Sequence, residues 1–217
     1  IKRNNVILTK HLYISKYPIN QSSKSLILGT IHPHNDINNT SNFKIDFFYG
    51  NKNSLWTILS EAKNIRLDTL NEILKFLAQN KISISDMILE CERLNDKVTA
   101  DKDLQNLVVN QNLKNEILKS DIETIYFTSA FSKNNAAKLF FDLFGLQNQI
   151  PINWKDTYEI NIDFFGKKIK CVILLSPSGA SNIGISRSKI YLNKQNLYED
   201  LKTPVKQFKI DFYKEKF

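Results

Sequence analysis

The chain has 217 residues, of which 42% are hydrophobic, and it carries a net charge of +8. That length suffices for one domain with a full core, and no stretch approaches the roughly 20 apolar residues of a membrane span. Thirty Lys and Arg against 22 Asp and Glu favour a polyanionic partner, with nucleic acid first.

Cysteine and histidine are few and scattered. Cys91 and Cys171 form no Cys-x-x-Cys pair, and with three separate histidines they do not make a zinc or iron–sulfur ligand set. Both thiols are interpreted as core residues in a reducing compartment, and residues 1–10 are polar and basic, unlike a signal peptide. We therefore expect a cytoplasmic monomer with no metal and no cofactor.

The first part of the chain predicts an arm, a buried strand and then helices. Residues 1–24 are a polar lead-in with short apolar pieces. Leu26 to Leu28 is an unbroken apolar run that fits a strand buried on both faces, and it ends at Gly29 in a loop with Pro33. By apolar spacing, the helices expected next are 55–62 and 67–79. A third is expected from Ser85 or Asp86 towards Leu94, and it would carry Cys91. Residues 101–120 are expected to be helical in part, with a break at 110–112.

The second part predicts two further strands of the same sheet. Residues 122–127 fit a strand that ends in Thr128-Ser129, followed by a helix over 135–144 that Gly145 stops. Strand, turn and helix in that order form the crossover unit of a parallel sheet. Apolar runs at 158–164 and 167–175 surround a glycine as in a hairpin, and a last helix is expected over 196–201.

These elements predict the fold class. No repeat or linker divides the chain, so residues 1–217 are expected to be a single three-layer α/β domain with a short, mostly parallel sheet between helices. Its parts are an arm (1–24), a core (25–185) and a tail (186–217).

Three strands are thus expected to end in polar loops at one edge of the sheet: 29–33, Thr128-Ser129 and Ser176-Pro177-Ser178. Ligands of open α/β sheets bind at that edge. Exposed amides and small hydroxyls suit phosphate contacts, and the aromatic residues at 47–49 suit a stacked base. The combination predicts a pocket for an extruded nucleotide.

At these motifs the chain resembles the uracil-DNA glycosylase superfamily, most of all its mismatch-type and deoxyinosine-type branches. Leu26-Ile27-Leu28-Gly29-Thr30-Ile31-His32-Pro33 is similar to the first motif, and Phe48-Tyr49-Gly50 with Asn53-Ser54-Leu55-Trp56 to the stretch after it. The segment from Ile82 through Cys91 and Arg93, the strand Ile125-Tyr126-Phe127-Thr128-Ser129 and Leu175-Ser176-Pro177-Ser178 follow in the family's order. The resemblance covers about residues 25–185.

The resemblance implies a monofunctional DNA glycosylase, which flips a damaged or modified base out of DNA and hydrolyses its N-glycosidic bond. Three positions depart from the usual motifs. Ile31 stands where many members carry a water-placing Asp or Asn, Ser176 replaces the usual His, and Thr128-Ser129 replace a base-reading Asn. Either other residues carry the activity, or the base is not uracil, as for a hypermodified base of phage DNA, or the chain is an inactive DNA-binding relative.

Base release also needs residues that place a water and stabilise charge on sugar and base. The catalytic candidates are Asp36, Asn53 and His32; the base-binding candidates are Gly29, Thr30, Ile31, Phe48, Tyr49, Thr128 and Ser129; the DNA-binding candidates are His34, Ser176, Ser178, Gly179, Ser181 and Asn182. Each also has a plain structural interpretation, such as a solvated loop acid for Asp36, a helix cap for Asn53 or core packing for Phe48.

Overall fold

The computed structural model describes residues 6–34, 44–50 and 55–217. Two of the catalytic candidates, Asp36 and Asn53, lie outside these described residues.

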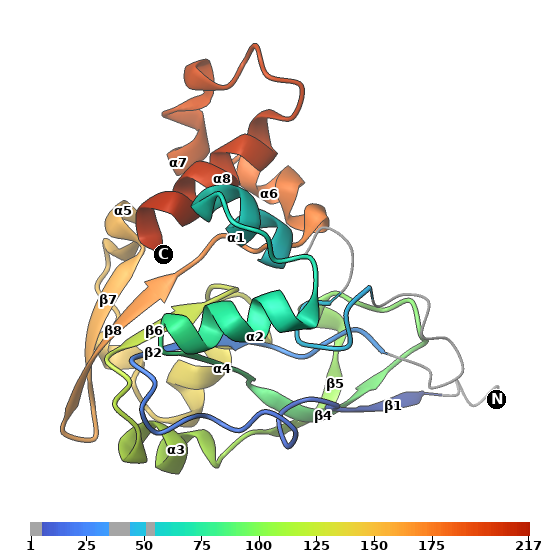
Figure 1. Cartoon of the computed structure of the whole chain (residues 1–217), viewed down its shortest axis with the longest axis vertical. Coiled ribbons are helices and arrows are strands. Elements are labelled where there is room, and N and C mark those ends of the chain that lie inside the picture. The colour runs from blue at the N-terminus through green and yellow to red at the C-terminus, as the bar shows by residue number, and fades with distance from the viewer. Residues whose placement is uncertain (1–5, 35–43, 51–54) are drawn as a thin grey trace.

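A five-stranded sheet of order β3-β2-β6-β8-β7 forms the centre of the molecule (Figure 1). The first four strands in that order are parallel and β7 is antiparallel to β8, so the class is α/β with a mostly parallel sheet, as predicted. The strands are β2 (Ser25–Gly29), β3 (Ile82–Asp86), β6 (Thr124–Phe127), β7 (Glu159–Phe164) and β8 (Lys167–Ile173). The predicted hairpin is β7 and β8, with Gly166 at its turn in a left-handed conformation (φ 89°).

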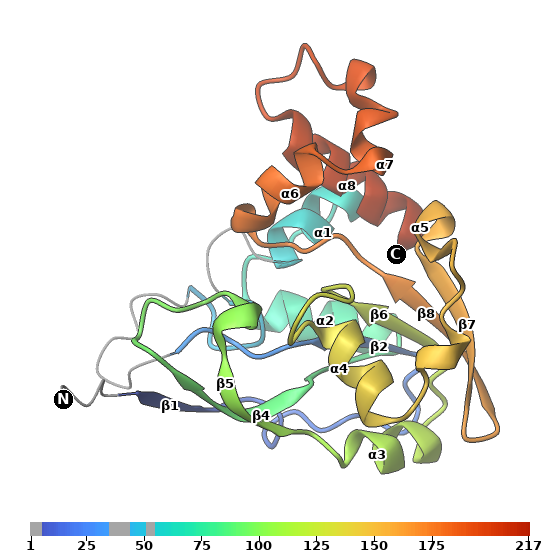
Figure 2. The ribbon, with the colours of Figure 1, turned by 180° about the vertical axis from the view of Figure 1, so that it is seen from behind.

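Helices cover both faces of this sheet (Figures 1 and 2). One apolar cluster joins α1, α2 and α8 to the face that carries Ile27, and the other joins α3 and α4 to the face of Leu26 and Leu28. Alternate side chains of β2 therefore enter opposite cores, which explains its unbroken apolar run. The helices are α1 (Leu55–Lys63), α2 (Leu70–Gln79), α3 (Leu113–Lys119), α4 (Ala136–Leu143), α5 (Trp154–Thr157), α6 (Asn182–Ser186), α7 (Lys189–Leu192) and α8 (Pro204–Lys216).

Two helix boundaries follow from local chemistry. Helix α2 begins after Thr69 and not at the predicted Leu67, because Thr69 and Glu72 form a reciprocal capping box. Helix α4 matches its prediction and is followed by Gly145 with φ 67°.

A second, antiparallel sheet of order β1-β4-β5 was not predicted. Its strands are β1 (Ile7–Lys10), β4 (Ile88–Arg93) and β5 (Gln105–Val109). The helix expected from Ser85 or Asp86 to Leu94 is wrong, because this segment is the end of β3 followed by β4. Cys91 therefore lies on a strand, although it is buried, as is Cys171.

The two ends of the chain also differ from expectation. The arm supplies β1 to the second sheet and Tyr13 to the main core. Of residues 101–120, only a short 3-10 turn at Asp101–Asp103 and α3 are helical. The tail helix expected over 196–201 is a 3-10 turn at Gln195–Leu197, and the long tail helix is α8, which packs beside α1 (Figure 1). No helix within the described ranges has the length and apolar character to cross a membrane.

Candidate functional site

The three loops predicted to share one edge of the sheet do meet there, around a cleft of about 360 Å³. Residues from all three line it: Thr30, Ile31, His32 and Pro33 after β2, Thr128 and Ser129 after β6, and 176–181 after β8. Tyr49 and Asp86 complete the wall together with residues 99–101. The cleft therefore brings together two carboxylates, a tyrosine and several hydroxyl groups.

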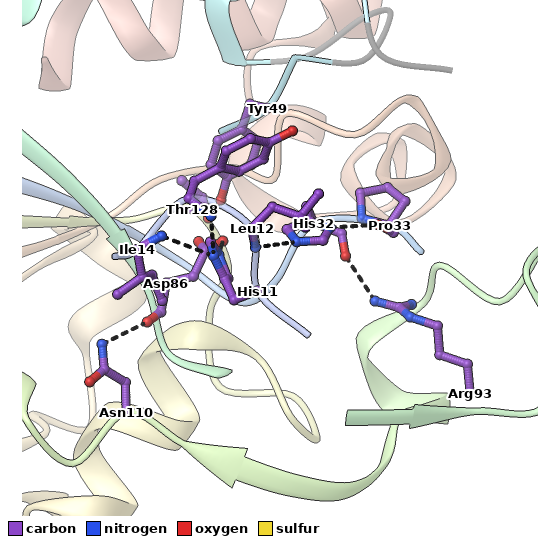
Figure 3. A network of polar contacts seen from close by, with 11 residues as sticks. His11, Leu12, Ile14, His32, Pro33, Tyr49, Asp86, Arg93, Asn110 and Thr128 are labelled. Atoms are coloured by element: carbon purple, nitrogen blue, oxygen red, sulfur yellow. Dashed lines mark hydrogen bonds and ion pairs between the residues drawn. The ribbon is translucent and has the colours of Figure 1, made fainter. Parts of the chain in front are cut away.

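Asp86 ends β3, directly beside Gly29 in the parallel register. Its partner is His11, whose Nδ1 accepts the backbone N–H groups of Tyr13 and Ile14 at 3.1 and 3.2 Å. The proton of the imidazole must therefore be on Nε2, which donates to Asp86 Oδ2 at 2.8 Å (Figure 3). The two side chains are only 2% and 4% exposed.

The other carboxylate oxygen of Asp86, Oδ1, differs from Oδ2 in its contacts. Asp86 Oδ1 is enclosed and makes no hydrogen bond to any residue that the structure describes. Because a carboxylate has only acceptors to offer, this atom is suited to an N–H or O–H donor of a ligand in the cleft. Buried polar atoms are nearly always paired, so an unpaired one on the wall of a cleft indicates a binding group.

Tyr49 lies next to this carboxylate. Its hydroxyl is 2.6 Å from Thr128 Oγ1, and burial raises the pKa of the phenol well above its usual range, so it stays protonated. A Cβ on Gly29 would lie 2.0 Å from the Tyr49 hydroxyl and 2.3 Å from Asp86 Oδ1. Glycine is therefore required at position 29 by space, since both oxygens occupy the place of a side chain.

Asp101 is the second carboxylate of the cleft. Thr30 Oγ1 donates to its Oδ2 at 2.9 Å, and Asn134 Nδ2 donates to its backbone oxygen at 2.9 Å. Burial raises the pKa of Asp101 to about 6, although the Thr30 hydrogen bond opposes the rise; the nearby charge of Asp86 adds to it. Asp101 therefore exchanges its proton close to neutral pH, as a general base must.

His32 is held by the backbone on both sides of its ring. Nδ1 donates to the carbonyl oxygen of Pro33 at 2.6 Å and Nε2 accepts the N–H of Leu12 at 3.1 Å (Figure 3). Burial lowers the pKa of His32 to about 4, so the ring is neutral at physiological pH. Its geometry favours a role in shaping the loop over proton donation to a base.

Arg93 fixes the same loop from β4. The guanidinium is 1% exposed and donates to the carbonyl oxygen of His32 at 2.9 Å and to Thr9 Oγ1 at 3.0 Å. Thr9 Oγ1 is also 3.0 Å from His34 Nδ1, which places His34 beside the second sheet, and His34 is not among the described residues that line the cleft.

The remaining candidates fall in three places. Phe48 is 1% exposed and packs against His11 and Tyr13, so of the two predicted base-stacking residues only Tyr49 lines the cleft. The hydroxyls of the 176–181 loop partly serve the loop itself, because Ser178 Oγ accepts the Ala180 N–H at 3.3 Å. Asn182 lines a neighbouring cavity.

Sequence reasoning missed His11, Asp86 and Asp101 as site residues. Asp86 stood within the segment that resembles the glycosylases but was interpreted as a helix start, and only its place as a β-strand end brings it to the cleft. His11 and Asp101 carry no local signal, because His11 follows β1 and acts on the cleft only through Asp86, and Asp101 lies between β4 and β5 of the second sheet.

Fold and cleft together define an α/β protein with a polar cleft at the carboxyl edge of a parallel sheet, the edge at which such sheets bind their ligands. Comparison with protein-family models, with curated proteins and with solved structures finds no match for the chain. No three His, Cys, Asp or Glu side chains of the described residues gather as a metal site.

Proposed function

We propose that this protein is a monofunctional DNA glycosylase. The observation that carries the proposal is the pair of carboxylates in one cleft: Asp86 with an unpaired oxygen at the wall, and Asp101 with a pKa near neutrality. The net charge of +8 supports a nucleic-acid partner.

The chemistry of base release divides between these groups. The extruded base enters the cleft beside the Tyr49 ring, and Asp86 Oδ1 accepts a hydrogen bond from a donor on the edge of the base. Asp101 accepts a proton from the attacking water and offsets the positive charge that develops on the sugar. We propose that water replaces the base without strand cleavage, as in the monofunctional glycosylases that the chain resembles.

A second candidate substrate is a hypermodified base. Ile31, Thr128 and Ser129 line the cleft where many glycosylases place amide or carboxylate contacts to uracil, and they offer only an apolar side chain and hydroxyls. The proposed activity therefore includes bases other than uracil.

The test is a panel of duplex and single-stranded DNAs that carry uracil, hypoxanthine or modified cytosines, treated with alkali to cut abasic sites. We expect release of at least one base, and a loss of about 10²-fold or more in Asp101→Asn, the low end for a positioned catalytic group. The matched control is Asp103→Asn, an exposed acid of the same turn. Binding without release of any base would instead favour the non-enzymatic DNA-binding relative.

A further inference from the structure

A second cavity, of about 390 Å³, lies behind the loop that closes the cleft. Pro177 and Gly179 line both spaces, so this loop is the wall between them. The far side of the cavity is formed by Thr57 and Ile58 of α1 and by the first turns of α8 with Lys209.

Lys209 is a buried cation without a carboxylate partner. The residue is 2% exposed, and its Nζ donates to Ser178 O at 2.8 Å and to Ser181 Oγ at 2.9 Å. No ion pair joins Lys209 to an acid among the described residues, whereas Lys206 on the same helix pairs with Glu61 at 2.7 Å. Buried charges are normally paired, and an ammonium has three N–H donors, of which two are used.

One further feature of the cavity suits an anion. Helix α8 starts at this cavity, and Thr203 before it makes no side-chain cap to the first N–H groups. The positive end of this helix dipole adds to the charge of Lys209 at the cavity.

We propose that the cavity behind the loop is a phosphate subsite and that Lys209 is its buried cation. The inference rests on the proposed function in one respect only: the phosphate belongs to the DNA strand whose flipped nucleotide fills the cleft. The 176–181 loop then lies between base and phosphate. Lys209 both holds this loop and neutralises the phosphate, which accounts for a buried ammonium with one donor unused.

The first experiment measures DNA binding against salt with an oligonucleotide that carries no releasable base. Lys209→Met should bind about tenfold more weakly and reduce the slope of log K against log salt by about 1, the value for one lost phosphate contact. Lys209→Arg should keep the slope, and the control Lys214→Met, an exposed lysine of the same helix, should retain the affinity of the parent.

The second readout is pH. Burial lowers the pKa of Lys209 to about 8, so the parent should lose affinity as the pH rises above 8. Lys209→Arg should not, because arginine stays charged. A purely structural lysine would not give this difference.

The third readout separates the source of the phosphate and guards against misfolding. Inorganic phosphate should compete with DNA for the parent and not for Lys209→Met. Thr57→Glu puts a carboxylate at the mouth of the cavity, on an exposed position of α1. This variant should abolish the competition of inorganic phosphate with DNA, although Lys209 is still present.

Equal DNA affinity and an equal salt slope for Lys209→Met and the parent would overturn the subsite. If Lys209→Met does not fold, unchanged binding of DNA and inorganic phosphate by Thr57→Glu would overturn it instead. Binding of inorganic phosphate that needs Lys209, without an effect on DNA, would overturn the assignment to DNA. Lys209-dependent DNA binding without release of any base leaves the subsite standing and rejects the glycosylase.

Discussion

His11 Nε2 lies 2.8 Å from Asp86 Oδ2, and both side chains are buried. This contact joins the end of β3 to the segment that follows β1, and so ties the second sheet to the floor of the cleft. It also leaves Asp86 Oδ1 as the one oxygen of the carboxylate available for a ligand.

Replacing His11 by Ala should destabilise the protein by about 3 kcal/mol, because it leaves a buried carboxylate without its donor. Urea unfolding measures the loss. His34→Ala, a half-buried histidine that contacts only a hydroxyl among the described side chains, should cost much less. If the double variant His11→Ala/Asp86→Ala loses as much unfolding free energy as the two single variants lose together, the two residues are not coupled.

The proposed base release should depend on the ionisation of Asp101. Because burial raises its pKa to about 6, the rate should fall about tenfold for each pH unit below 6 and level off above it. Single-turnover rates between pH 4.5 and 8 measure this profile. Asp101→Asn should be slow and lack the step at 6; a step that persists in the variant would assign it to another group.

The same carboxylate should weaken the fold at neutral pH. The pKa of Asp101 is about 6 in the folded state against an ordinary value of 3.8 in the unfolded chain, so the folded protein binds the proton more tightly and gains stability as pH falls from 6 to 4. Asp101→Asn should therefore be more stable than the parent at pH 7, and the difference should vanish below pH 4. Thermal unfolding at both pH values tests the sign.

Gly29→Ala should disrupt the cleft. The added methyl group would lie 2.0 Å from the Tyr49 hydroxyl and 2.3 Å from Asp86 Oδ1, so both side chains must move. We expect a stability loss of roughly 1–3 kcal/mol by overpacking and the loss of any base release. The control is Gly184→Ala, where the added atom meets nothing within 4 Å; an equal effect at both positions would contradict this interpretation.

Arg93→Met should loosen the loop that carries His32. It removes charged donors from the carbonyl oxygen of His32 and from Thr9, hydrogen bonds of the kind that contribute roughly 1.5–3 kcal/mol each. Urea unfolding should show a loss of at least the lower value. Arg66→Met, at an exposed arginine whose side chain is 80% accessible, should change stability little.

Local patterns were sufficient for β2, β6 and β8 of the parallel sheet, although not for β3, whose end was expected to start a helix. The apolar run Leu26 to Leu28 of β2 is unbroken because both faces of this strand are covered, and the order of strand, turn and helix predicts the common edge of β2, β6 and β8. The loops of the cleft could therefore be located from the sequence, and Thr30, Tyr49 and Thr128 do line it.

Strand β3 of the main sheet and the whole second sheet could not be predicted in this way. Ser83 and Ser85 weaken the apolar pattern of β3, yet both are buried, and Ser83 Oγ accepts the N–H of Asn20 and contacts Ser23. The strand thus depends on partners from the arm. Strand β4 pairs with β1 and β5, and pairing between distant segments leaves no trace in a short window of sequence.

The origin of His11 in the arm has a consequence for the order of synthesis. His11 and Asp86 stand 75 positions apart, and β1 pairs with β4 further along the chain, so a ribosome exposes the arm well before its partners exist. Until β4 emerges, the arm has neither a strand to pair with nor an acid to bind. The cleft is therefore completed by a late, long-range closure, and until then the nascent arm is open to contact with a chaperone.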